Sequence, residues 1–254
     1  MPGRRRASIV WQRGLAVVEY DRDAEPGILG PQDARNVLRG AVMGVETMKK
    51  GAMTGRQRVL AALDFKPADR APVDMGGHNC SGAHVSVVAG LRQALGLDGP
   101  GDRVKVVEPY QMLGEVGADL RAVLGIDVVN LPGPKNMFGF ANTDWKPWRT
   151  FDGTDVLVAG LFNTEPQPNG DILMYPEGDR GVPASGRMPK GGYYFDSIIR
   201  QEPIDDEKLD PADNLEEFGQ VSDEDLEYYE AQATALYENT DQAIAMHLPG
   251  GAFG

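Results

Sequence analysis

The sequence predicts an α/β fold with a parallel sheet, because short apolar stretches of strand length alternate with stretches of helical character. Three stretches have the composition of buried strands, at residues 71–75, 126–131 and 242–248. Each is followed by glycine, proline or polar residues that are typical of loops. In parallel barrels the loops at the carboxyl ends of the strands build the active site, so we expect functional residues in these loops.

The folded domain is predicted to begin at Met53. Thr54 is a suitable N-cap, and the apolar residues after it form a helical stripe that ends at Leu63. We interpret residues 1–52 as an N-terminal extension that is poorly ordered or partly helical, with a candidate helix at 32–49.

The middle of the chain predicts two more helices and a hairpin. Helices are expected at 83–95 and 109–124, because Gly96 and Gly125 follow them as C-terminal caps. Asp152-Gly153-Thr154 is a hairpin signal between two extended stretches. The extended stretches expected in this part are residues 104–107, 145–151, 155–159 and 172–175.

The last third begins with a predicted loop at 176–193, which is rich in glycine and proline. Ser222 and Asp225 form a capping box for a helix that runs to about Asn239. Most of the acidic excess of the chain lies in residues 196–241. We interpret this segment as a solvated acidic surface, and the alternative is a docking face for a basic partner.

Composition excludes several classes of function. The 254 residues carry 25 Lys and Arg against 38 Asp and Glu, and the net charge of −13 argues against nucleic-acid binding. No apolar run approaches the length of a membrane span. The single cysteine, Cys80, excludes a disulfide framework and a zinc site built from several cysteines of this chain. We therefore expect a cytoplasmic protein in a reducing compartment.

From Arg56 to Gly254 the order of several motifs resembles the uroporphyrinogen decarboxylase superfamily, and most closely its coenzyme M and corrinoid methyltransferase branch. The resemblance implies a (β/α)8 TIM barrel, of which residues 53–254 supply about the first half, with a β-hairpin and loop insertion. The motifs that carry it are Arg58-Val59-Leu60-Ala61-Ala62-Leu63, Asp69-Arg70-Ala71-Pro72-Val73-Asp74, Ser81-Gly82-Ala83-His84, Pro109-Tyr110-Gln111-Met112-Leu113, Leu124-Gly125-Ile126-Asp127-Val128-Val129, Tyr175-Pro176-Glu177-Gly178-Asp179, the segment 186–196 and Asn239-Thr240-Asp241.

The sequence departs from the decarboxylases at their substrate site. Those enzymes bind an acidic tetrapyrrole with an arginine-bearing loop after the first strand, and residues 74–80 contain no arginine. They also present an aspartate after the second strand, which residues 130–135 lack. The resemblance therefore favours a methyltransferase that moves a methyl group between a corrinoid carrier protein and a thiol or other small acceptor.

In that branch a zinc ion is held by a His-x-Cys pair and a later Cys in the second half of the barrel, beyond the region matched here. Zinc and a corrinoid on a partner protein are thus implied for the full-length family. One alternative is a non-catalytic half-barrel that self-associates through its open edge. A weaker alternative keeps decarboxylation in porphyrin biosynthesis.

Two residues are candidate catalytic groups, Asp74 and His84. Asp74 lies in an apolar stretch, where a carboxylate either faces the barrel mouth or pairs with Arg70 or a backbone amide. His84 is placed by the resemblance at the start of the helix after the first strand, and its alternative is a capping or packing histidine. His78, Cys80 and His84 are three metal-capable side chains within seven residues, but no fourth ligand is indicated.

The remaining candidates are predicted to bind substrate. Arg187 lies in a glycine- and proline-rich loop and is suited to an anionic group, or it is an ordinary loop arginine. Tyr194, with its aromatic neighbours, forms a pocket wall or packs in the core. Gln111 is expected at the barrel mouth. His247 ends the third strand, and the alternation along that strand leaves its direction open.

Overall fold

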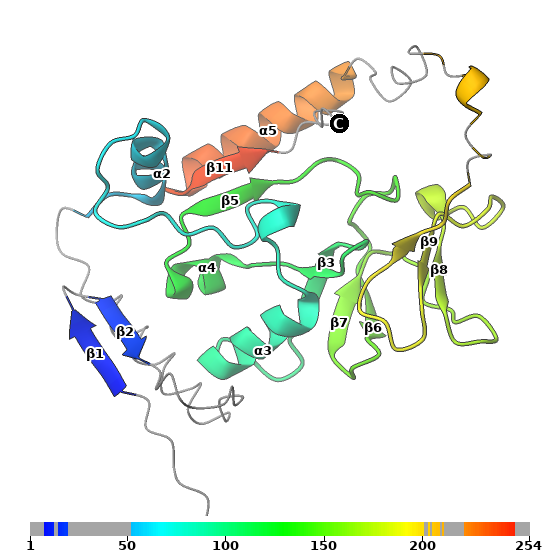
Figure 1. Cartoon of the computed structure of the whole chain (residues 1–254), viewed down its shortest axis with the longest axis horizontal. Coiled ribbons are helices and arrows are strands. Elements are labelled where there is room, and N and C mark those ends of the chain that lie inside the picture. The colour runs from blue at the N-terminus through cyan, green and yellow to red at the C-terminus, as the bar shows by residue number, and fades with distance from the viewer. Residues whose placement is uncertain are drawn as a thin grey trace, which may run out of the picture.

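The computed structural model describes residues 52–200 and 221–246, together with residues 8–12, 15–19, 203, 205–208 and 210 (Figure 1). These residues form a mixed α/β structure with four helices, and their strands lie in four separate sheets that do not close into a barrel. Among the described helices, none has both the length and the apolar character that crossing a membrane requires.

The largest sheet has the strand order β4-β3-β7-β6. These strands are β3 (Val104–Glu108), β4 (Leu113–Gly114), β6 (Lys146–Arg149) and β7 (Asp155–Val158). β3 and β7 are parallel, and each pairs with an antiparallel strand at the sheet edge. Alternate residues of β3 are buried, as expected for a strand with one face against the core. Helix α3 (Val85–Leu95) contributes Val85 and Val88 to that core.

A second, parallel sheet pairs β5 (Val128–Leu131) with β11 (Ala243–Met246), with Ala243 opposite Val128. The helices α2 (Gly55–Leu63) and α5 (Asp223–Asn239) contact both of these strands (Figure 1). Helix α4 (Ala118–Leu124) precedes β5 and ends at Gly125, whose φ of 64° is the left-handed C-cap predicted there. Two of the three predicted buried strands thus pair in parallel, as the sequence indicates.

The third sheet is antiparallel and contains β8 (Ile172–Met174), β9 (Gly186–Met188) and β10 (Asp196–Ser197). A separate antiparallel pair is formed by β1 (Ser8–Gln12) and β2 (Leu15–Glu19), which the sequence analysis did not anticipate. The candidate helix at 32–49 lies outside the described residues. Three short 3-10 helices occur at Asn79–Ser81, Pro176–Gly178 and Asp206–Lys208.

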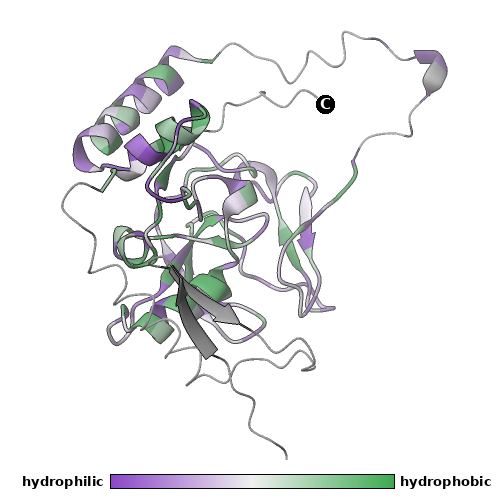
Figure 2. Ribbon diagram, turned by 60° about the vertical axis from the view of Figure 1, so that its left-hand side comes forward, coloured by the Kyte–Doolittle hydropathy of each residue, from purple (hydrophilic) through white to green (hydrophobic). Residues whose placement is uncertain are grey.

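Hydrophobic residues gather in the inner strands and in α3, whereas α5 carries many hydrophilic residues (Figure 2). Tyr229 is the residue of α5 that is buried. The acidic first turn of this helix, Asp223 to Asp225, lies at the positive end of the helix dipole, where carboxylates are stabilising. The Ser222 hydroxyl accepts a hydrogen bond from the Asp225 amide, so the predicted N-cap is confirmed, whereas the Asp225 side chain does not return the bond that would complete the predicted capping box.

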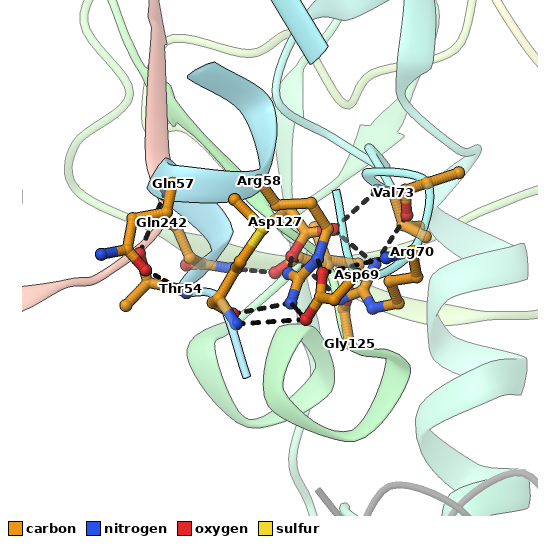
Figure 3. Close-up of polar contacts among 12 residues, drawn as sticks. Thr54, Gln57, Arg58, Asp69, Arg70, Val73, Gly125, Asp127 and Gln242 are labelled. Carbon is orange, nitrogen blue, oxygen red and sulfur yellow. Dashed lines mark hydrogen bonds and ion pairs between the residues drawn. The ribbon is translucent and has the colours of Figure 1, made fainter. Parts of the chain in front are cut away.

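A buried ionic cluster joins α2 to the start of β5 (Figure 3). Arg58, which is 1% exposed, binds Asp69 through two of its nitrogens and also binds Asp127. Arg70 donates to both carboxylate oxygens of Asp127, at 2.6 and 2.9 Å. Two arginines thus balance two carboxylates, and Asp127 also accepts the amide of Val73 at 2.8 Å. This is the arrangement in which buried charge is tolerated.

Two predicted elements were wrong in the first half of the domain. Residues 71–75 are not a strand. The Val73 amide donates to the Asp127 carboxylate, the Val73 carbonyl accepts the Asp127 amide, and no ladder continues along the segment. The helix expected at 109–124 covers only Ala118–Leu124. Before it, the Glu108 carboxylate binds the amides of Tyr110 and Gln111, and this turn leads into β4.

The loop predicted at 176–193 is also only partly correct, because it contains the strand β9. Arg187 in β9 bonds to buried Asp171 at 2.6 Å, and this ion pair fixes the strand beside β8. Asp74 is not paired with Arg70, whose carboxylate partner is Asp127. The Oδ1 of Asp74 instead accepts a hydrogen bond from the Gly77 amide at 2.9 Å, so Asp74 pairs with a backbone amide, the second partner expected for it.

Candidate functional site

A pocket of about 790 Å³ opens where four segments meet: the N-terminus of α3, the turn after β3, the tip of the β6–β7 hairpin and residues 193–196. This volume is within the usual range for small-molecule sites. Aromatic and aliphatic side chains form most of its wall. The lining residues are His84, Ser86, Val87, Tyr110, Gln111, Leu113, Asp152, Tyr193, Tyr194, Phe195 and Asp196.

The aromatic side of the pocket has a rigid base and a solvent-facing rim. Phe195 is 1% exposed and packs edge-to-face against Phe138 and Phe162, so its ring is held from behind by the core. Tyr193 and Tyr194 are 56% and 60% exposed, and their rings are therefore accessible from solvent. The predicted role of Tyr194 as a pocket wall is consistent with this placement.

His84 fastens the N-terminus of α3 to the aromatic segment. Its Nδ1 accepts the Ser86 amide at 3.2 Å, as an N-cap acceptor does. Its Nε2 lies 2.9 Å from the Tyr193 carbonyl oxygen, which only accepts, so Nε2 carries the proton and donates. Both nitrogens of the neutral ring are therefore occupied. In this arrangement His84 positions Tyr193 and has no lone pair left for a metal ion or for a substrate proton.

The turn after β3 presents Tyr110 and Gln111 to the pocket. Burial raises the pKa of the Glu108 carboxyl, although the amides of Gln111 and Tyr110 oppose this by binding it at 2.7 and 2.9 Å. The Tyr110 hydroxyl lies 3.0 Å from the Ser197 hydroxyl, which ties the turn to β10. Sequence reasoning missed Glu108, whose signal is a carboxylate at the end of an apolar strand immediately before a proline.

Asp152 brings a carboxylate to the pocket from the tip of the β6–β7 hairpin. Burial pushes its pKa upward, but hydrogen bonds from the Thr150 hydroxyl and the Thr154 amide outweigh burial and hold the pKa well below its usual range. Asp152 is thus ionised at neutral pH. The sequence analysis identified it only as a turn residue.

The other predicted site residues lie elsewhere or outside the described residues. Asp74 and Arg187 do not line the pocket. The Asp74 carboxylate accepts the Gly77 amide, and Arg187 forms an ion pair with Asp171. His247 lies outside the described residues. The pocket therefore brings together three of the predicted residues, His84, Gln111 and Tyr194.

The metal candidates do not form a centre in the described part of the chain. The Nδ1 of His78 accepts the amide of Cys80 at 3.1 Å, where it caps a 3-10 turn. The Cys80 thiol is free and exposed. Nowhere within the described residues do three His, Cys, Asp or Glu side chains converge as metal ligands would. These residues do not fit a zinc ion.

Comparison with protein-family models, with curated proteins and with solved structures found no match for this chain. The family resemblance of the sequence therefore stays a prediction. What the structure adds is a pocket of small-molecule size with an aromatic wall, a fixed histidine and an ionised carboxylate.

Proposed function

We propose that this pocket is a substrate site, and that the chain is the substrate-binding part of a cytoplasmic, corrinoid-dependent methyltransferase. One observation carries the proposal: His84, Gln111 and Tyr194, chosen from three separate stretches of sequence, line one cavity. The resemblance that suggested these residues also suggests the reaction and the barrel. In this proposal the parallel pair β5–β11 belongs to the barrel wall.

The charge of the pocket favours this reading over decarboxylation of a tetrapyrrole. Its lining residues in the described chain include two carboxylates, Asp152 and Asp196, and no lysine or arginine. A substrate with several carboxylates would be repelled there and would lack guanidinium partners. A neutral or cationic methyl donor or acceptor fits the same surroundings without this penalty.

The residues of this chain would bind and orient the substrate. Phe195, held by the core, provides a dry floor, and the rings of Tyr110 and Tyr194 provide apolar side walls. The Gln111 side chain offers both a donor and an acceptor to a polar group of the substrate. The corrinoid of a carrier protein supplies the methyl-transfer chemistry when it is bound.

The proposal is tested by mixing the full chain with a corrinoid and candidate small methyl donors or acceptors. Methyl transfer is measured as a change in the absorbance of the corrinoid. We expect transfer that Gln111→Ala and Tyr194→Leu reduce at least about tenfold, the scale of losing one well-placed contact. Asp155→Asn, at an exposed position of β7 outside the pocket, serves as the matched control and should keep full activity. Transfer that the pocket variants leave unchanged, or no transfer with any donor, would contradict the proposal.

A further inference from the structure

The pocket combines accessible aromatic rings with fixed negative charge. Tyr193 and Tyr194 expose more than half of their surface, and Tyr110 lines the wall beside them. Asp152 and Asp196 lie in the same lining, and hydrogen bonding keeps the pKa of Asp152 low although burial opposes it. No positively charged side chain of the described chain lines the pocket to neutralise the two carboxylates.

The pocket rings are also available to a cation from outside. Within the described residues, the cation–π contacts of the chain pair Arg56 with Tyr237 and Lys105 with Trp145. Both rings lie outside the pocket. An aromatic wall attracts a cation through the negative face of each ring, and this attraction is larger for a poorly hydrated organic cation than for a metal ion. A neighbouring carboxylate adds a Coulomb term of the same sign.

We propose that the pocket binds a small alkylated ammonium cation, with its headgroup against Tyr193 and Tyr194 and its charge facing Asp152. The identification of this cation as the substrate rests on the proposed function. The binding itself does not, because it follows from the rings and the carboxylates alone. Among ligands of similar size, the pocket therefore discriminates by charge.

The test is isothermal titration of the full chain with choline and with its uncharged isostere, 3,3-dimethylbutan-1-ol. The two ligands share size, shape and hydroxyl, so the difference in their affinities measures the charge. We expect choline to bind at least about tenfold more tightly, since it gains both the cation–π and the Coulomb terms. Choline binding should weaken as ionic strength rises, whereas binding of the alcohol should not.

Two pairs of variants locate the effect. Asp152→Asn keeps an oxygen for the Thr154 amide and should weaken choline about tenfold, whereas Asp155→Asn removes the same charge three residues away and should not. Tyr194→Leu should weaken choline about two- to thirtyfold, and Tyr194→Phe should restore it because the ring is retained. Circular dichroism checks that each variant is folded.

The outcomes separate this inference from the proposed function. Choline binding that depends on Asp152 and Tyr194 supports the inference, whether or not methyl transfer is found. Equal or tighter binding of the uncharged alcohol would overturn it, and so would the absence of choline binding at millimolar concentration. Methyl transfer from an uncharged donor together with no choline binding would leave the proposed function standing and the inference refuted.

Discussion

Replacing Asp127 by Asn should destabilise the fold more than the loss of any exposed carboxylate. Asp127 is 2% exposed and accepts hydrogen bonds from Arg58, Arg70 and the Val73 amide. An asparagine there leaves two guanidinium groups facing one carboxylate, Asp69. Breaking a buried ion pair from one side costs about 3–5 kcal/mol. Because Arg58 keeps its two bonds to Asp69, we take the lower end of this range, about 3 kcal/mol.

Urea denaturation measures this loss. The ring of Trp148 packs against the ring of Phe162, with centroids 5.3 Å apart, so its fluorescence reports the loss of the core. With a urea dependence of about 2 kcal/mol per molar, the midpoint should fall by about 1.5 M. The control is Asp155→Asn, which breaks the exposed pair with Arg149 and should leave the midpoint within error of the parent. If the two variants shifted the midpoint equally, the Asp127 cluster would not hold α2 against β5 as described.

Three further predictions concern local structure. His84→Ala should lower the free energy of unfolding by about 1–2 kcal/mol, because the N-cap and the bond to Tyr193 are both lost. His84→Asn should recover the part that comes from the cap, and equal losses of unfolding free energy in the two variants, measured by urea denaturation, would contradict the capping role. Gly77→Ala should lower the thermal midpoint, because a Cβ there would lie 2.5 Å from the Asp74 Oδ1, and an unchanged midpoint would refute this contact. Bonding to its arginine partner lowers the pKa of Asp69 below the unfolded value of about 3.9, so the unfolded chain binds more protons in acid. Its stabilising effect is present above about pH 4 and is lost as the pH falls further, and denaturation midpoints that stay flat down to about pH 2 would contradict it.

The sequence predicted best those elements whose ends carry local signals. Thr54 and Gln57 form the capping box of α2, and Gly96 ends α3 in the left-handed conformation. The hairpin at Asp152-Gly153-Thr154 pairs Arg149 with Asp155 as its turn residues indicate. In each of these cases a few neighbouring residues decide the structure, so no knowledge of distant contacts was needed.

The wrong predictions depend on side-chain hydrogen bonds to the backbone, one distant in sequence and one local. Residues 71–75 are apolar and look like a strand, but the carboxylate of Asp127 takes the Val73 amide that a strand partner would need. The helix predicted from residue 109 fails because Glu108 caps the turn that follows it, and Met112 then adopts a φ of 56°. Side-chain hydrogen bonds of this kind leave no periodic pattern in the sequence, whether their partner is near or distant.

The candidate site shows the same division. His84, Gln111 and Tyr194 were found from motifs, because each lies in a stretch whose order resembles one family. Asp152 was missed, because a hairpin-turn aspartate is ordinary in sequence and becomes notable only when the hairpin tip meets α3. Arg187 was expected at the site, but its pairing with Asp171 could not be read from a loop rich in glycine and proline.

The central claim is that the pocket between α3 and the β6–β7 hairpin is the ligand site of this protein. A crystal structure of the full chain with tetramethylarsonium tests it most directly, because arsenic scatters anomalously and marks the position of the bound cation. The account predicts an anomalous peak inside this pocket, against the rings of Tyr193 and Tyr194 and facing Asp152. A peak at another place on the chain, or an empty pocket at a saturating concentration, would contradict the account.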